Sequence, residues 1–488
     1  MLKQTPLNSN ILYQIGSGFI AAGLGGVLGF LIVQVDNPIF VIGGVIGALV
    51  AFVTVLNADF GLLVLVFMIY TRFSDVMVRQ GIPSTLQPYM ALIALGIATR
   101  WIFTRELPRD VLKATGYVAA YALVVFGSIF YASDFSIAFG TGIDFLKDGV
   151  ITIIMVVLIS HVATFRKVMW VLLGAGIFLG TISVYQGVTG QYNSEFWGFG
   201  RSGFLNIVGY TEGNRVTGPM GDPNYYAQLI LVLIPIAMNR FVSEKHWIMR
   251  GLAAWAVLAC TLTVVFTYSR GAVVALIIMG VFAMLHRPPR IADLVLGVVL
   301  FAILMAFLPS NYTARIATIL DVFGGTNDIR TEVSFRGRAS ENIVAVLMFI
   351  DRPILGVGVN NYPLYYQQYS RTLGLDPRAE NRQAHNLFLQ VAAESGLIGI
   401  LVYGSVIWVI LKGMQDAWRR LKNVGMEEYA SMFLSFAVGF VGYLGAALFV
   451  HAAYPRYFWL LAGIGFAVPQ ITQKLLASVS SSGRVNEQ

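Results

Sequence analysis

The chain has 488 residues, of which 57% are hydrophobic and 12% are charged, and its mean hydropathy is +0.72. Soluble domains average about 25% charged residues, so the composition excludes an ordinary soluble protein and indicates an integral membrane protein. The formal net charge is +8 at pH 7, and the single cysteine, Cys260, excludes an intramolecular disulfide.

Apolar runs close to 20 residues long recur along the whole chain, and a helix needs about 20 such residues to cross a bilayer. The sequence therefore predicts an all-α polytopic membrane protein with about 12–14 transmembrane helices. The candidate spans are residues 12–33, 38–56, 58–71, 85–103, 114–131, 148–163, 167–186, 223–239, 249–267, 271–286, 291–309, 387–411, 429–450 and 455–473.

These spans divide the chain into parts of different character. One long segment is polar and rich in arginine, and connections longer than about 12–15 residues are uncommon and often functional. We predict N-terminal transmembrane helices (1–186), transmembrane helices with arginine motifs at their outer ends (187–309), a large, partly helical extracytoplasmic loop (310–385), C-terminal transmembrane helices (386–475) and a disordered Ser-rich tail (476–488).

Basic residues are concentrated in alternate short connections, and short cytoplasmic loops of membrane proteins are enriched in Lys and Arg. We therefore expect these connections and both termini to be cytoplasmic, which puts 187–222 and 310–385 on the outer side. The basic connections contain Arg100, Arg105, Arg109, Lys113, Arg166, Lys167, Arg240, Lys245, Arg250, Arg287, Arg290, Lys412, Arg419, Arg420 and Lys422.

The connections expected outside carry many arginines and a single lysine, Lys147. The guanidinium group matches phosphate geometry and stays charged when it is partly desolvated, so this bias predicts recognition of an anion. A general preference of the chain for arginine would explain part of the bias. The arginines are Arg72, Arg79, Arg201, Arg215, Arg270, Arg315, Arg330, Arg336, Arg338, Arg352, Arg371, Arg378, Arg382 and Arg456.

The first candidate motif precedes the span at 223–239 and runs from Arg215 to Asn224. Asp222 followed by Pro223 predicts a helix start, since a carboxylate caps the first turn and proline suits the first helical position. The positive end of this helix would face outward as an anion site, and Arg215 would add a full charge. The alternative is an ordinary capped membrane helix next to an exposed arginine.

The second motif is the tight outer turn that contains Ser269 and Arg270. Arg270 falls in the first turn of a helix, where a cation opposes the helix dipole, and it lies near hydrocarbon depth. We expect a negative group to compensate it. That group would be either a protein carboxylate or a lipid diphosphate.

The third motif lies within the long polar segment and begins with Arg336 and Arg338. Ile343, Val346, Leu347 and Ile350 follow at helical spacing, which predicts an amphipathic helix that lies on the membrane surface or roofs a cavity. The glycine pair at 356 and 358 lacks the strand–helix context of a nucleotide loop. We interpret it as permissive backbone for a turn.

The fourth motif is His385, where the polar segment joins an apolar helix. Neutral imidazole can accept a proton from a hydroxyl at neutral pH, which suits a general base. A lone interfacial histidine is more often a plain polar residue, but among outward histidines only His451 competes. Glu394 is the acidic residue deepest in an apolar run. On a regular helix it would face away from His385, which favours a packing role.

Several absences narrow the class. The sequence has no pair of acidic residues at D-x-D spacing, no G-x-x-x-x-G-K-[ST] phosphate loop and no Cys/His cluster typical of zinc. We therefore expect neither a metal nor another cofactor. The few ionisable residues within the spans argue against a proton-coupled pump.

Four motifs in this order resemble the O-antigen ligase and O-antigen polymerase superfamily of bacterial membrane glycosyltransferases. They are R-x-x-G-P-x-G-D-P-N (215–224), S-R-G-A (269–272), D-R-P-I-L-G-V-G-x-x-x-Y (351–362) and H-N-L-F-L-Q-x-x-x-E-x-G (385–396). The resemblance covers about residues 200–410 and implies a GT-C-like fold in the bacterial inner (plasma) membrane, with an active site on the periplasmic side.

The resemblance also implies a chemistry and its residues. A glycan would move from undecaprenyl diphosphate to a hydroxyl acceptor, with inversion and without metal. His385 would be the base, and Arg215, Arg270 and either Arg336 or Arg338 would hold the diphosphate. The candidate supporting residues of this site are Asp222, Asn224, Asn386 and Glu394.

Three alternatives stay open at this point. The acceptor would be lipid A core, protein or another lipid for a ligase, and a growing repeat-unit chain for an exopolysaccharide polymerase. A lipid-linked oligosaccharide flippase would need charged residues along a membrane-spanning cavity, and a membrane scaffold would not need the arginine-rich loop. The expected partners are the lipid-linked glycan, the acceptor and membrane lipids, with no nucleic acid.

Overall fold

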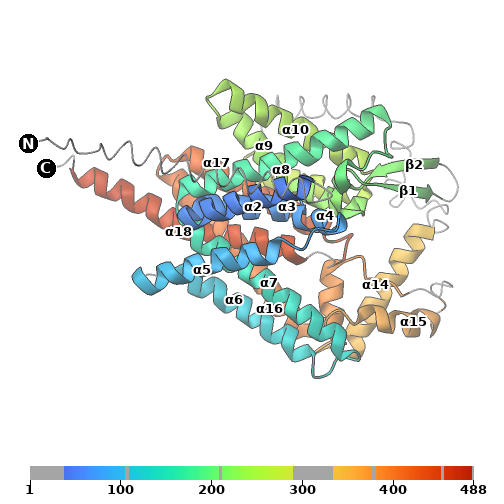
Figure 1. Cartoon of the computed structure of the whole chain (residues 1–488). Helices are drawn as coiled ribbons and strands as arrows, with labels where there is room; N and C mark the ends of the chain where they lie inside the picture. The colour runs from blue at the N-terminus through green and yellow to red at the C-terminus, as the bar shows by residue number, and fades with distance from the viewer. Residues whose placement is uncertain are drawn as a thin grey trace, which may run out of the picture. The chain divides into compact units, whose positions relative to one another are not determined.

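The computed structural model describes residues 38–104, 109–207, 211–288, 333–372, 374, 381–451 and 455–485. The chain divides into a first unit, Met1–Gly61, and a second unit, Leu62–Gln488. Helices make up most of the described residues (Figure 1), with one two-stranded antiparallel sheet. This confirms the prediction of an all-α polytopic membrane protein.

The helices and strands begin and end as follows. The first unit contains α2 (Pro38–Leu56) and the start of α3 (Ala58–Tyr70). The second continues with α4 (Phe73–Arg79), α5 (Leu86–Thr104), α6 (Arg109–Ser128), α7 (Phe135–Leu158), α8 (Val162–Thr189), η1 (Phe196–Gly198), β1 (Ser202–Ile207), β2 (Thr211–Val216), η2 (Gly218–Met220), α9 (Pro223–Ser243), α10 (Trp247–Phe266), α11 (Arg270–His286), α14 (Val333–Asp351), α15 (Tyr362–Thr372), α16 (Leu387–Asn423), α17 (Glu427–Ala446) and α18 (Pro455–Val485).

Seven of the described helices are long and apolar enough to cross a membrane, or up to eight if the bent pair α3–α4 is one span. Every predicted span from residue 38 onward falls on a helix, except 291–309. The predicted spans 12–33 and 291–309, and the part of the large loop before 333, lie outside the described residues. The positions of the apolar runs therefore predicted the helices well.

Two helices are longer than their apolar runs. α7 begins at Phe135 and not near 148, because Asp134 accepts a hydrogen bond from the Ile137 backbone and caps the helix 14 residues earlier. α18 continues to Val485 through most of the tail that was predicted to be disordered. A helix that has already formed extends at little cost through residues with no proline.

α9 lies in the interior of the second unit and packs against α10 and α17. Nearly all of its side chains from Tyr225 to Ala237 are buried, whichever face they lie on, as expected for a helix that is apolar all round. The few polar groups along it are hydrogen-bonded. The Tyr226 hydroxyl pairs with the Ser183 hydroxyl, and the Gln228 amide donates to the Tyr443 carbonyl.

α16 is broken at Gly396, and the segment after α14 forms hydrogen bonds with the backbone on both sides of the break. Gly396 has φ 61° and ψ −158°, a region that essentially only glycine occupies. The N–H groups of Val357 and Gly358 donate to the carbonyls of Ala393 and Glu394, and Leu397 N–H donates to the Pro353 carbonyl at 2.7 Å. Backbone groups that a continuous helix would satisfy are thus satisfied by the connecting segment.

The glycine at 356 makes this close contact possible. It has φ 73°, and a Cβ there would lie 2.4 Å from the Glu394 carbonyl carbon. At Gly396 a Cβ would lie 2.4 Å from the Ile354 carbonyl carbon. The motifs at 351–362 and 385–396 therefore meet at one backbone junction. Gly356 and Gly358, which were predicted to allow a turn, both have positive φ.

α14 and α15 lie beside the first turns of α16 (Figure 1) and share a small core with them. That core includes Val344, Met348, Tyr362 and Tyr366. The predicted amphipathic helix is present as α14, and three of the four residues named for its apolar face are exposed. Ile343, Val346 and Ile350 are exposed, at 43%, 42% and 61%. The exposed apolar stripe fits a helix on a membrane surface.

Candidate active site

His385 is paired with a buried carboxylate. Its Nδ1 atom lies 2.8 Å from Oε2 of Glu341 on α14, and Arg382 Nε lies 2.7 Å from Oε1 of the same carboxylate. The Glu341 side chain is fully buried, whereas 29% of the His385 side chain is exposed. The imidazole is therefore partly accessible and lies against a buried carboxylate.

The surroundings of Nδ1 decide which tautomer the neutral ring adopts. Nδ1 lies 2.8 Å from a Glu341 oxygen and 3.1 Å from the Gln383 carbonyl oxygen. Both neighbours are acceptors, so the proton of a neutral imidazole belongs on Nδ1 and the lone pair on Nε2. A carboxylate that orients a histidine in this way is a common feature of general bases.

Glu341 was not among the residues selected from the sequence. It was overlooked because it lies in a helix whose apolar face was assigned to other positions. The signal was present, however, since Glu341, Val344, Ala345 and Met348 recur at the spacing of one helix face and all are buried. An acidic residue in phase with a buried face needs a partner, and here the partners are Arg382 and His385.

The backbone around His385 is constrained. His385 has φ 44°, which is uncommon for a residue with a side chain. Asn386 then caps α16 by accepting hydrogen bonds from Phe388 N–H and Leu389 N–H, both at 3.1 Å. Leu387 N–H donates to the Ala447 carbonyl at the end of α17. The predicted supporting residue Asn386 thus sets the start of the helix that follows the base.

A second histidine adjoins the first. The rings of His385 and His451 have centroids 5.1 Å apart, and the ring of Tyr225 of α9 has its centroid 5.3 Å from that of His451. The Tyr225 hydroxyl donates to the His451 carbonyl at 2.7 Å. Burial and, to a lesser degree, the nearby His385 lower the pKa of His451 to about 3. His451 is therefore neutral at physiological pH.

The first predicted arginine, Arg215, is at the end of β2 and is buried. Its Nε donates to the Thr267 carbonyl at 2.6 Å, and an Nη lies 3.4 Å from Oδ1 of Asn224. The Ser269 hydroxyl donates to the same Asn224 oxygen at 2.9 Å. Asn224 therefore joins the 215–224 motif to the 269–272 motif, which are separate in the sequence.

Asp222 caps α9 as predicted, because its carboxylate accepts from the N–H groups of Asn224 and Tyr225 at 2.7 and 3.1 Å. Ser269 caps α11, which begins at Arg270. The starts of α9 and α11 consequently adjoin through Asn224 and Ser269. Because Tyr225 also contacts His451, a chain of contacts runs from Arg215 to His385.

The remaining predicted residues differ in how they are placed. Arg338 lies on α14 one turn before Glu341, whereas the side chain of Arg336 lies outside the described part of the structure. Glu394 is buried, and its two oxygens accept from Asn360 N–H at 2.8 Å and from the Gln390 amide at 3.0 Å. Glu394 thus supports the junction between α16 and the 353–361 segment.

A cavity of about 480 Å³ adjoins the histidines and is lined by residues of α4, α6, α7, α9, α16, α17 and α18. Gln383, Leu387 and His451 form its edge near His385. Among its lining residues, Arg456 lies 3.6 Å from Asp148 and 3.9 Å from Asp75. The lining also includes aromatic side chains such as Tyr121, Phe145 and Trp459.

Together these features define a class: a polytopic membrane protein in which a carboxylate-paired histidine adjoins a cavity lined by polar and apolar side chains. Residues 255–404 match the family model described as O-antigen ligase. This match supports the resemblance to the O-antigen ligase and O-antigen polymerase superfamily of membrane glycosyltransferases that the motifs had predicted. No curated protein matches the chain.

The matched residues run from α10 into α16 and include Arg270, Arg338, Glu341, His385 and Glu394. Arg215, Asp222 and Asn224 precede the match. Their connection to it is the hydrogen bonding of Arg215 to Thr267 and of Asn224 to Ser269. The tertiary structure thus brings the start of α9 next to the matched residues.

Proposed function

We propose that the protein transfers a glycan from undecaprenyl diphosphate to a hydroxyl acceptor on the outer face of the bacterial plasma membrane, as an O-antigen ligase does. The observation that carries this proposal is the pairing of His385 Nδ1 with the buried Glu341 carboxylate at 2.8 Å. It supports a base whose Nε2 accepts a proton, in a chain whose family acts on lipid-linked glycans.

In the proposed step, the acceptor hydroxyl gives its proton to Nε2 of His385 while its oxygen attacks the anomeric carbon of the glycan. The bond between that carbon and the diphosphate oxygen breaks, and undecaprenyl diphosphate leaves with the electron pair. Attack opposite the leaving group inverts the anomeric configuration. Glu341 stabilises the imidazolium that forms, since opposite charges at short distance in a buried setting attract strongly.

The leaving diphosphate gains negative charge as the bond breaks, and fixed cations stabilise such charge best when they are already in place. Arg215 and Arg270 are the proposed cations, with Arg338 or Arg336 from α14. The hydrogen bonds of Arg215 to Thr267 and Asn224 hold its guanidinium in position before the donor binds. No metal is required in this scheme.

The test uses full-length protein in detergent, a glycan on undecaprenyl diphosphate and candidate acceptors, with EDTA present. We expect transfer by the wild type, a loss on the order of 100-fold or more in His385→Ala, and full activity in His161→Ala, an exposed histidine at the start of α8. Equal activity in all three proteins would remove the base from the proposal.

Product length separates ligation from polymerisation. One glycan per acceptor indicates a ligase, and a ladder of repeat units indicates a polymerase of the same superfamily. If no acceptor is glycosylated but labelled lipid-linked glycan crosses a vesicle bilayer, the transporter alternative replaces the proposal.

A further inference from the structure

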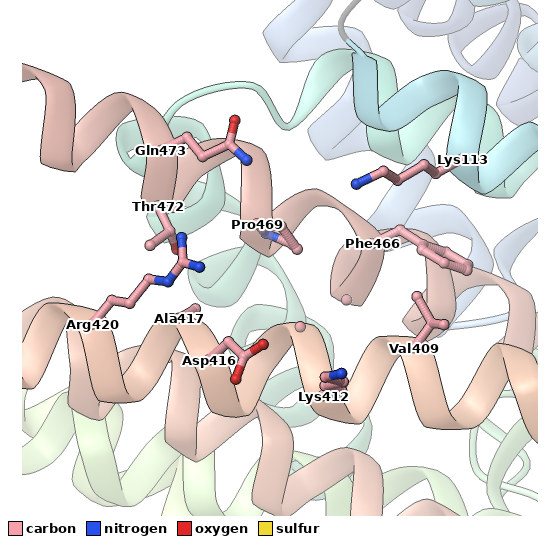
Figure 2. A pocket seen from close by; sticks show the side chains of 12 residues that line it. Lys113, Val409, Lys412, Asp416, Ala417, Arg420, Phe466, Pro469, Thr472 and Gln473 are labelled. Carbon is pink, nitrogen blue, oxygen red and sulfur yellow. The ribbon is translucent and has the colours of Figure 1, made fainter.

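A second cavity lies near the opposite end of α16 from His385, between α6, α16 and α18. Its volume is about 270 Å³. Lys113 of α6 and Lys412 and Arg420 of α16 line it, and Asp416 is the acidic residue among its lining. Figure 2 shows the ammonium group of Lys113 and the carboxylate of Asp416 pointing into the space between the helices. The lining therefore carries net positive charge.

Part of the lining of this cavity is apolar. Val409 of α16 and Phe466 and Pro469 of α18 form this part. The two helices approach closely at one point, where a Cβ on Gly413 would lie 3.0 Å from Cγ of Pro469. The lining thus combines charged side chains with apolar ones. A small soluble anion would need only the charged side chains.

The depth of the cavity matches the headgroup region of a bilayer. The unbroken part of α16, which follows Gly396, runs from Leu397 to Arg420 over about 35 Å at 1.5 Å per residue, and the hydrocarbon core is only about 30 Å thick. With Leu397 near one interface, Arg420 is therefore at the other, and Lys412 is in the half of the span next to it. Basic cavities between helices at such an interface suit lipid phosphates.

We propose that this cavity binds the headgroup phosphate of an anionic phospholipid, with Lys113, Lys412 and Arg420 around the phosphate and the lipid body against Phe466 and Pro469. A free phosphate would use the same cations but would gain nothing from the apolar wall. The proposal concerns a site remote from His385, goes beyond glycan transfer and does not depend on it.

Native mass spectrometry of the full-length protein tests the proposal, with no glycan donor present. The probes are phosphatidylglycerol, phosphatidylcholine and inorganic phosphate. We expect the wild type to retain phosphatidylglycerol more strongly than phosphatidylcholine, and inorganic phosphate at equal concentration not to displace it. Displacement by inorganic phosphate would show a free-anion site and overturn the lipid assignment, as would equal retention of the two lipids.

Variants locate the binding. Lys412→Gln and Arg420→Gln should each weaken retention about fivefold. Arg419→Gln removes the same charge from the same turn, is exposed and is outside the cavity lining, so it should have no effect. Asp416→Asn should strengthen retention, a gain that misfolding cannot produce. If Arg419→Gln weakens retention as much as Arg420→Gln does, the binding is a diffuse surface effect and the proposed site is wrong.

Discussion

The Nδ1 atom of His385 lies 2.8 Å from Oε2 of Glu341, and this carboxylate is fully buried between α14 and the start of α16. Arg382 contacts its other oxygen at 2.7 Å. The pair joins the polar segment to the helix that follows it, and it sets the tautomer of the proposed base.

Glu341→Gln keeps the shape of the side chain but removes its charge. We expect the turnover number to fall on the order of 100-fold, because the imidazolium formed during transfer loses its stabilising partner. The KM for the donor should change little, since Glu341 acts through His385. Steady-state kinetics with EDTA present measures both constants.

A matched control variant removes a hydrogen bond to the Glu341 backbone but keeps the Glu341 carboxylate. Tyr362→Phe deletes the 2.7 Å hydrogen bond from the Tyr362 hydroxyl to the Glu341 carbonyl but leaves the carboxylate in place. Its turnover should fall far less than that of Glu341→Gln. If the two variants are equally impaired, Glu341 serves the fold of α14 and not the base.

Arginines at the two ends of α11 allow a specific contact with the diphosphate to be distinguished from a general effect of positive charge. Arg270→Gln, at the start of the helix, should lower the turnover about 100- to 1000-fold, because a cation next to the leaving group is lost. Arg287→Gln, directly after the other end, should leave the rate unchanged. Comparable losses in both would contradict a specific role for Arg270.

The broken helix α16 provides a stability test. Gly396→Ala introduces a Cβ in a backbone region that favours glycine and 2.4 Å from Ile354, so the free energy of unfolding should fall by about 2–5 kcal/mol. Gly404→Ala, on the same helix with open space around it, should raise it by up to about 1 kcal/mol. Thermal unfolding in detergent measures both, and an unaffected Gly396→Ala protein would mean that α16 can form without the break.

His451 makes stability depend on pH. Its pKa is lowered to about 3 from an ordinary value of 6.5, mainly by burial, so between these values the unfolded chain binds more protons than the folded chain does. The contribution of His451 to stability is therefore full above pH 6.5 and is lost as the pH falls toward 3. His451→Gln should flatten this loss by up to about 1.4 kcal/mol per pH unit.

Thermal unfolding between pH 7.5 and 4.5 measures the slope. His161→Gln is the control, since His161 is exposed and should leave the slope as it is. Identical slopes for wild type and His451→Gln would show that His451 becomes charged in the folded protein without cost.

The proposed orientation can be tested directly because the one cysteine, Cys260, is buried. Arg371→Cys at the end of α15 and Arg419→Cys near the end of α16 both introduce an exposed thiol. In intact cells or spheroplasts, a membrane-impermeant maleimide should label only Arg371→Cys. Labelling only of Arg419→Cys would invert the proposed topology.

The sequence by itself determined the local features of this protein. Apolar runs of membrane-spanning length located the helices, and Asp222 with Pro223 identified the start of α9, because capping and hydrophobicity act over a few neighbouring residues. The motif around His385 was also recognisable, because it resembles that of a known family. The glycines at 356 and 396 were visible too, although not their mutual contact.

Only the tertiary structure decided which residues meet. Glu341 and His385 are on different elements, as are Arg215 and Thr267, or His451 and Tyr225, and their distances depend on how helices far apart in the sequence pack. Neither the periodicity of α14 nor that of α16 reveals that α16 breaks at Gly396 and is completed by backbone from 353–358. Such contacts follow from side-chain volume and backbone hydrogen bonding summed over the whole packed core, which no local pattern contains.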